Sequence, residues 1–242
     1  MLNIYTSSSY MNQKETFMET LHKPNVLMIS EITADGKLTL GKGVSSKLLM
    51  KHMSHEAEIL LHETRAGYDA IMVGSSTIRI DNSFLTVRMV PGKNPLRVIP
   101  NSMADLPVES NVFATENAKT VLAVSALAPE ERLAAFREKG VEIIVCGEEH
   151  VDFPQLMDIL YTKYQVKKLI IEGGPTLNWH MLHHRLVDEI RLIHMPFIVG
   201  GSDTPSLVGG MPLASENEMI RLDLRSTRMY GSNLVTEYQV LY

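Results

Sequence analysis

Cysteine, basic charge and long apolar runs are scarce in this sequence, and each shortage excludes a class of protein. The single cysteine, Cys146, excludes an intrachain disulfide framework and a zinc site built from several cysteines. A net charge of −5 provides no basic field for nucleic acid, although local arginines can still bind a phosphate. No apolar run approaches the length of a membrane span, and the N-terminal residues lack the apolar core of a signal peptide. We therefore expect a cytoplasmic protein with no nucleic-acid or membrane partner.

The composition is that of a globular protein, with 45% hydrophobic and 21% charged residues. A length of 242 residues suits a single α/β domain. Residues 1–23 are polar and are expected to form an extension, with a short helix near Glu15–Leu21. No stretch rich in proline, glycine or serine divides residues 24–242, so these residues are expected to form one domain.

Short apolar segments alternate with amphipathic segments along the chain. Continuous apolar strands separated by helices predict a mostly parallel sheet that helices cover on both faces. The last two segments alternate apolar and polar residues around a short turn, which predicts a C-terminal antiparallel hairpin. Strands are expected at 26–32, 70–74, 96–100, 120–125, 141–146, 167–172 and 187–196, the hairpin at 218–230 and 233–242, and helices at 54–67, 129–140, 153–164 and 175–184.

Ligands of an open α/β sheet bind beyond the carboxyl ends of the strands, so the turns at those ends are the places to search. In one such turn Glu172 ends a strand, and Gly173 and Gly174 precede a helix that begins at Pro175. Glycines permit a close approach of the backbone, and the start of a helix offers unpaired N–H groups; together these can bind a phosphate. A plain turn in which Thr176 helps to cap the helix explains these residues equally well.

A second turn follows the strand at 70–74. Thr77 and Asp81 are four residues apart, so one helical turn would place both side chains on one face, where they would suit a ribose or an amide. Arg88 suits a phosphate because of its planar guanidinium. A solvated loop with a capping aspartate is an equally good interpretation. Arg65 lies near the C-terminal end of a helix, where the helix dipole alone favours arginine, unless Arg88 converges on it.

No metal site is predicted from the histidines. His180, His183 and His184 belong to one predicted helix that carries no HExxH arrangement and no neighbouring carboxylate, so a solvent-facing surface is the better interpretation. The segment His55–Glu58 contains the His-x-Glu of zinc nucleobase deaminases, but the Pro-Cys-x-x-Cys partner is absent.

Taken in order, the motifs DAIMVGSST, LTVR, NPLRV, IIEGGPTLN and LVDE resemble the reductase family of riboflavin biosynthesis. This family is related to dihydrofolate reductase and includes the C-terminal half of the bifunctional deaminase-reductase. The resemblance covers residues 24–242, and the lack of a deaminase half is most similar to the stand-alone archaeal and fungal enzymes. It implies a dihydrofolate-reductase-like α/β fold, a homodimer, and NADPH-dependent reduction of a pyrimidine ribosylamine 5′-phosphate to its ribityl form.

The resemblance also implies roles for individual residues. Hydride transfer is the chemistry of the cofactor, so no nucleophile is expected, and the proton would come from water or from Asp35. Glu172 would bind the ring or the ribosyl end of the substrate. The cofactor would be bound by Thr77, Asp81 and Ser102, with its phosphates at Gly173, Gly174, Pro175 and Thr176, and the substrate phosphate by Arg65 and Arg88, with Leu85 beside it.

Several motifs differ from the family pattern. The usual Ser-Leu-Asp-Gly is Thr-Ala-Asp-Gly at 33–36, Asp-Asp-Pro is Asp-Asn-Ser at 81–83, and Val-Asp-Ser is Pro-Asn-Ser at 100–102. The segment 41–53 is long, and Ser45 and Ser46 are candidates for a substrate contact there. These differences leave two alternatives open: a reductase of another heterocycle such as a pterin, or a non-catalytic nucleotide-binding module. The sequence does not distinguish NADPH from NADH, nor a diamino from a deaminated substrate.

Overall fold

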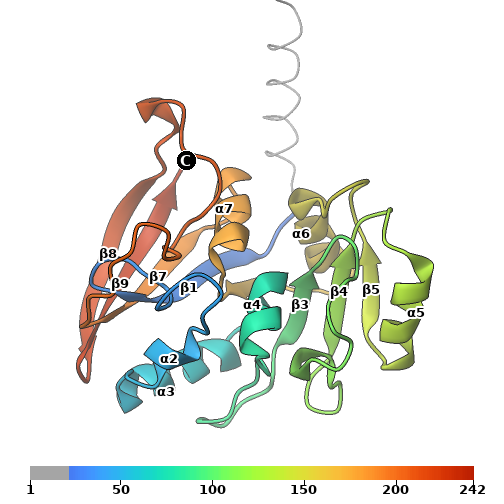
Figure 1. Cartoon of the computed structure of the whole chain (residues 1–242), viewed down its shortest axis with the longest axis horizontal. Helices are drawn as coiled ribbons and strands as arrows, with labels where there is room; N and C mark the ends of the chain where they lie inside the picture. Colours follow the sequence, from blue (N-terminus) through green and yellow to red (C-terminus); the bar gives the residue numbers. More distant parts are fainter. Residues whose placement is uncertain (1–21) are drawn as a thin grey trace, which may run out of the picture.

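The computed structural model describes residues 22–242, so the helix expected near Glu15–Leu21 lies outside the described residues. One sheet of nine strands runs through this part of the chain, in the order β5-β4-β3-β2-β6-β1-β7-β9-β8 (Figure 1). The strands are β1 (Asn25–Thr33), β2 (Ala70–Met72), β3 (Leu96–Pro100), β4 (Thr120–Val124), β5 (Glu142–Val145), β6 (Lys168–Ile171), β7 (Glu189–Met195), β8 (Arg221–Tyr230) and β9 (Asn233–Leu241).

The strand directions confirm the prediction of a mostly parallel sheet with a C-terminal antiparallel hairpin. β1 pairs in parallel with β6 and β7, and β2, β3, β4 and β5 continue the parallel arrangement. β9 is antiparallel to β7, and β8 is antiparallel to β9. The helices are α2 (Lys47–Met50), α3 (His55–Ala66), α4 (Ser75–Asp81), α5 (Glu130–Glu138), α6 (Phe153–Thr162) and α7 (Pro175–His183), with 3₁₀ turns η1 (Asn111–Phe113) and η2 (Glu216–Glu218).

Helices cover both faces of the parallel strands, which explains why these strands are apolar throughout. α6 and α7 pack on one face, where Leu156 and Met181 are fully buried. α3, α4 and α5 pack on the opposite face, with Leu61, Ile78 and Phe136 in its core. The start of α3 is as predicted, because the Ser54 Oγ accepts a hydrogen bond from the backbone of the first helical turn.

The order of the strands creates a crevice at the middle of the sheet. The chain runs from β1 outward through β2, β3, β4 and β5, then returns to insert β6 between β2 and β1, and finally continues on the other side with β7. The connections that follow β6 and β2 therefore leave the sheet in different directions. Such a switch point is where open α/β sheets bind ligands, at the carboxyl ends of the strands.

Candidate active site

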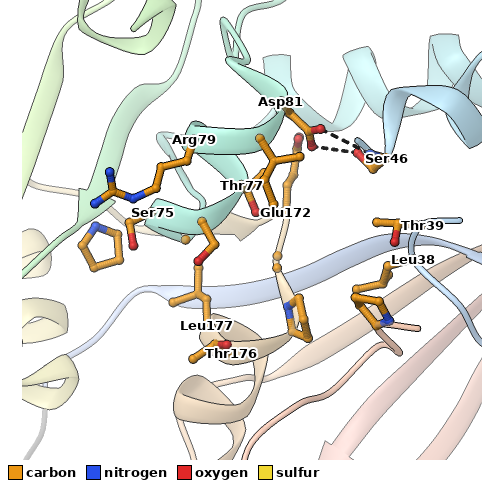
Figure 2. Close-up of a pocket in the computed structure, with 18 of the residues that line it drawn as sticks. Leu38, Thr39, Ser46, Ser75, Thr77, Arg79, Asp81, Glu172, Thr176 and Leu177 are labelled. Carbon is orange, nitrogen blue, oxygen red and sulfur yellow. Dashed lines mark hydrogen bonds between the residues drawn. The ribbon is translucent and has the colours of Figure 1, made fainter. Parts of the chain in front are cut away.

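A cavity of about 910 Å³ opens at this switch point. Its wall comes from segments 30–31, 38–50, 74–81, 100–105, 150–153 and 172–180. Figure 2 shows part of this wall, with Thr77 on α4 above Thr176 and Leu177 on α7, and with the Asp81 carboxylate directed toward Ser46. The cavity lies within the 300–1,000 Å³ range that is usual for small-molecule and cofactor sites.

The two glycines after β6 leave room between α4 and α7. Gly173 has a φ of +79°, which favours glycine, and its carbonyl accepts a hydrogen bond from the Gly74 amide at 2.8 Å. A Cβ atom on Gly174 would lie only 3.2 Å from the Thr77 Oγ1. Gly174 also begins α7, and no side chain caps this end of the helix. The N–H groups in the first turn of α7 therefore have no side-chain cap, an arrangement that is suited to bind an anion.

The opposite wall of the cavity is fixed by Asp81. Its carboxylate accepts hydrogen bonds from the Ser45 Oγ at 2.6 Å and from the Ser46 Oγ at 2.8 Å, and a longer one from the Ser46 amide (Figure 2). These contacts attach the segment before α2 to the end of α4. Asp81 lines the cavity, and both of its carboxylate oxygens accept hydrogen bonds from Ser45 or Ser46.

Glu172 and Arg65 form a two-pronged ion pair at the end of β6. The Arg65 Nε and Nη2 donate to the Glu172 Oε1 and Oε2 at 2.6 and 2.7 Å. The two side chains are 7% and 13% exposed, so the pair is largely withdrawn from water. Burial lowers the pKa of Arg65, but the Glu172 charge and hydrogen bonds overcome this effect and raise it. Glu172 lines the cavity, whereas Arg65 lies behind it.

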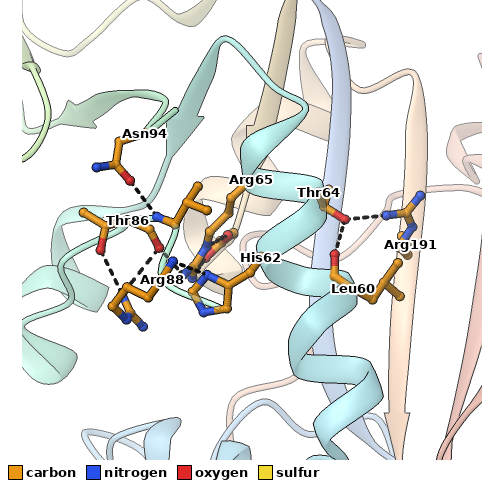
Figure 3. Close-up of polar contacts among 10 residues, drawn as sticks. Leu60, His62, Thr64, Arg65, Thr86, Arg88, Asn94 and Arg191 are labelled. Carbon is orange, nitrogen blue, oxygen red and sulfur yellow. Dashed lines mark hydrogen bonds and ion pairs between the residues drawn. The ribbon is translucent and has the colours of Figure 1, made fainter. Parts of the chain in front are cut away.

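Arg88 lies close to this pair, on the loop that follows α4 (Figure 3). Its amide donates to the His62 Nδ1 at 3.2 Å, and its Nη1 donates to the Thr86 Oγ1 at 2.9 Å. Burial and the nearby Arg65 charge lower the pKa of Arg88. The nearby Glu172 carboxylate, whose charge opposes this lowering of the Arg88 pKa, is already bound by Arg65. The Arg88 guanidinium, exposed on the surface, is therefore suited to bind an anion.

Comparison with known proteins agrees with this geometry. The family model of the RibD C-terminal domain matches residues 24–236. The chain belongs to this family. It is therefore an oxidoreductase of riboflavin biosynthesis, and membership implies a nicotinamide cofactor. The glycine turn and the uncapped start of α7 fit the diphosphate of such a cofactor, because a side chain at Gly174 would fill the space.

Two relatives match almost their full lengths. A 2,5-diamino-6-ribosylamino-4(3H)-pyrimidinone 5′-phosphate reductase of Aquifex aeolicus is 48% identical over 91% of this chain and 98% of its own. The protein of that name from Methanothermobacter thermautotrophicus is 39% identical over 90% and 99%. The structure of Acinetobacter baumannii RibD matches with a TM-score of 0.77 and 19% identity over 97% of this chain and 63% of that one, and supports the fold alone.

The other RibD-family residues predicted from the sequence lie in different places. Ser102 lines the far end of the cavity, where its Oγ accepts a hydrogen bond from the Val151 amide at 3.1 Å. Leu85 is 3% exposed with a φ of +53°, in the loop before Arg88, and does not line the cavity. The loop after Gly200 is held to α7 because the Asn178 Nδ2 donates a hydrogen bond to the Leu207 carbonyl.

Asp35 does not suit the role of proton donor. Its carboxylate accepts hydrogen bonds from the Thr33 Oγ1, the Gly200 amide and the Val199 amide, at 2.6, 2.7 and 3.2 Å. The Thr33 hydroxyl, followed by the Gly200 amide, lowers the pKa of Asp35 to about 2. A carboxyl with this pKa holds no proton at neutral pH, and Asp35 is not part of the cavity wall. We interpret it as a clamp between the turn after β1 and the segment 197–200.

Residues that the sequence did not single out also line the cavity. Glu31 lies on β1 beside the end of β6, and burial raises its pKa to about 7, with the Glu172 charge adding to the effect. His150 and His180 lie at the end that contains Ser102. The signal for Glu31 was present in the sequence, since a carboxylate within an apolar strand costs free energy unless it has a use.

Two properties of the described chain bear on other kinds of site. Among residues 22–242, no group of three or more histidine, cysteine, aspartate and glutamate side chains is arranged to hold a metal ion. His180 stacks on Phe153, with 5.3 Å between the ring centroids. No helix in the same range has both the length and the apolar character that crossing a bilayer requires.

Proposed function

We propose that this reductase converts a pyrimidine ribosylamine 5′-phosphate to its ribitylamino form with NADPH, and that the substrate is the diaminopyrimidinone for which its two relatives are named. The observation that carries the proposal is a cavity in which a glycine turn suited to a diphosphate lies directly beside Glu172. Arg65 holds Glu172 from behind the cavity wall, and Arg88 lies close to this pair. A cofactor and a phosphorylated substrate together need two anion sites, which we assign to the glycine turn and to Arg88.

The cofactor is assigned to the turn between α4 and α7. Its diphosphate would rest on Gly173, Gly174 and the first N–H groups of α7, with Thr77 and Thr176 at either side. Ser102 would then meet the adenosine end. A bound nicotinamide supplies the hydride; the protein holds the two ligands together and excludes water.

The substrate is assigned to the other side of Glu172. Arg88 would bind the 5′-phosphate through its planar guanidinium. Arg65 is committed to Glu172 at 2.6 Å, so we assign it the role of orienting that carboxylate and of adding positive charge near the phosphate. Glu172 would accept hydrogen bonds from the sugar hydroxyls or the ring amino groups.

Steady-state oxidation of the cofactor tests the proposal. The purified protein is given NADPH or NADH with the diamino substrate, the deaminated substrate or dihydrofolate. We expect turnover of the diamino pyrimidine and none of dihydrofolate, since Arg88 has a use only for a phosphorylated ligand. Turnover of dihydrofolate alone would identify a pterin reductase, and tight NADPH binding without any turnover would identify a nucleotide-binding module.

We also propose that the enzyme is a homodimer. β8 forms an edge of the sheet, and Leu222, Leu224 and Met229 on it are 43%, 53% and 63% exposed. These exposed apolar side chains on an edge strand of ten residues form a surface that a second copy of the chain could cover. β7 lies inside the sheet, so we assign the contact between the two copies to β8. Light scattering coupled to size-exclusion chromatography would reject the dimer if only the monomer mass appears.

A further inference from the structure

Glu31 is the one ionisable residue of β1, and the other residues from Val26 to Thr33 are buried. Ile29 and Ile32 on the same strand are 1% and 7% exposed, whereas Glu31 is partly exposed and lines the cavity. An ionisable side chain in the centre of a sheet is costly, and such a group usually has a partner. Among the described residues, no other side chain forms a hydrogen bond or ion pair with the Glu31 carboxyl. Its partner is therefore to be sought among the ligands of the cavity.

The register of the sheet places Glu31 on the same face as Glu172. β1 and β6 are parallel, with Leu27 opposite Ile170, and alternate residues of a strand share a face. Leu27 and Glu31 therefore lie on the face that also carries Ile170 and Glu172. The two carboxyl groups approach closely enough for the charge of Glu172 to act on Glu31.

The surroundings of the two carboxyl groups differ. Glu172 from β6 is engaged by both prongs of Arg65 from α3. Glu31 has no such partner, and burial, followed by the Glu172 charge, raises its pKa to about 7, which the more distant Arg65 opposes only in part. On β7, the other neighbour of β1, Arg191 is paired with Glu237. Two neighbouring carboxyl groups in unlike environments are a common arrangement for acid–base chemistry.

The direction of the cofactor brings Glu31 to the reacting atoms. The cavity runs from Ser102 after β3, across the glycine turn between β2 and β6, to Glu31 on β1. With the diphosphate at Gly174 and the adenosine near Ser102, the nicotinamide end would lie toward β1. This step rests on the proposed function. It places the Glu31 carboxyl beside the position at which the anomeric carbon of the substrate would accept a hydride.

We propose that Glu31 is the proton donor of the reduction. Its carboxyl gives a proton to the ring oxygen of the ribosyl group as the bond between this oxygen and C1′ breaks, while the lone pair of the attached nitrogen forms a C1′=N bond. Hydride from the nicotinamide then reaches C1′ and the C1′=N bond becomes a single bond, so one hydride and one proton are consumed. The Glu31 carboxylate regains its proton from water. This step needs a carboxyl that is still protonated near neutral pH, which Asp35 is not.

A stability measurement without any ligand tests the protonation state of Glu31. A carboxyl whose pKa is raised by folding binds more protons in the folded protein, so it destabilises the fold progressively as pH rises from 4.5 to about 7. Thermal unfolding of the wild type and of Glu31→Gln should therefore agree most closely at pH below 5, and the variant should be the more stable above pH 7. Glu189→Gln, at an exposed strand position outside the cavity, is the control and should show no such divergence.

Kinetics with the diaminopyrimidine phosphate then test the role. Glu31→Gln should lower kcat about a hundredfold or more, the usual scale for a lost general acid, with a KM within a few-fold of the wild type. The fall of the wild-type kcat above pH 7 should be absent in the variant, and Glu31→Asp should recover part of the rate. A Glu31→Gln enzyme with wild-type kcat, whether or not its KM rises, would overturn the proposal and leave Glu31 at most a binding group. An inactive wild type would instead remove the proposed function, and the role of Glu31 with it.

Discussion

The Arg65 guanidinium at the end of α3 meets both oxygens of the Glu172 carboxylate at the tip of β6, at 2.6 and 2.7 Å. This pair joins the helix that borders Arg88 to the strand whose end forms the floor of the cavity. The sequence predicted separate roles for the two residues: Arg65 for the substrate phosphate, and Glu172 for the ring or ribosyl end of the substrate. In the structure the two side chains form one unit. The position of Glu172 in the cavity therefore depends on Arg65.

Removal of Arg65 should destabilise the fold. Arg65→Met leaves the Glu172 charge without its partner in a largely buried site, and breaking such pairs costs about 3–5 kcal/mol. Arg79→Met is the matched control, because its ion pair with Asp105 is 39% and 47% exposed and is expected to contribute only about 0–1 kcal/mol. Urea unfolding at neutral pH measures both. Equal, small losses in the two variants would contradict the view that the Arg65–Glu172 pair is structurally important.

Arg88 should bind the substrate phosphate and not the cofactor. Charge-assisted hydrogen bonds contribute roughly 1.5–3 kcal/mol, so Arg88→Ala should weaken substrate binding about tenfold to a hundredfold, at about 1.4 kcal/mol per tenfold. Arg88→Lys should recover little, because lysine lacks the planar fork. Calorimetry with the substrate, the dephosphorylated substrate and NADPH provides the test. If Arg88→Ala weakens NADPH binding and leaves substrate binding unchanged, the cofactor and substrate phosphates have been assigned to each other's sites.

Gly174 should be needed for cofactor binding. In Gly174→Ala the new Cβ would lie 3.2 Å from the Thr77 Oγ1, so the space between α4 and α7 should narrow and NADPH affinity should fall about tenfold, or roughly 1.4 kcal/mol. Gly67→Ala, which makes only an ordinary contact at 3.5 Å, is the control. Cofactor titration by fluorescence decides, and unchanged affinity in Gly174→Ala would remove the turn from the cofactor site.

Asp35 should act as a structural clamp. Its pKa is lowered to about 2, first by the Thr33 hydroxyl and then by the Gly200 amide, so its contribution to stability is complete above the ordinary pKa of 3.8 and is lost as pH falls toward 2. Asp35→Asn should therefore lower the melting temperature at pH 7 and converge with the wild type near pH 2, while kcat at a permissive temperature stays within a few-fold. A lower kcat with an unchanged melting temperature would instead identify Asp35 as a proton donor.

Much of the fold was predictable because its signals are local. Apolar strands alternating with amphipathic segments gave the parallel sheet, and Ser54 marked the start of α3. The four-residue helix α2 was not predicted, because it is too short to show a period and depends on distant contacts. One of these is the bond from Ser46 to Asp81, 35 residues away.

The site was predictable where backbone geometry selects the residue type. The pair Gly173–Gly174 and the four-residue spacing of Thr77 and Asp81 both placed residues on the cavity wall. The Arg65–Glu172 pair joins residues 107 apart, and no pattern along the chain reveals such a partner. The hydrogen bonds from Val199 and Gly200 to Asp35 were also not predictable, because aspartate before glycine is common in turns and does not reveal distant partners.

The transfer of deuterium from the cofactor tests the central claim most directly. The enzyme is incubated with the diaminopyrimidine ribosylamine phosphate and NADPH that carries deuterium at the transferable position of C4, and the product is analysed by mass spectrometry and NMR. The account predicts a ribitylamino product with a single deuterium at C1′, formed in proportion to the NADPH oxidised. Deuterium in the pyrimidine ring, or substrate recovered unchanged beside bound NADPH, would contradict it.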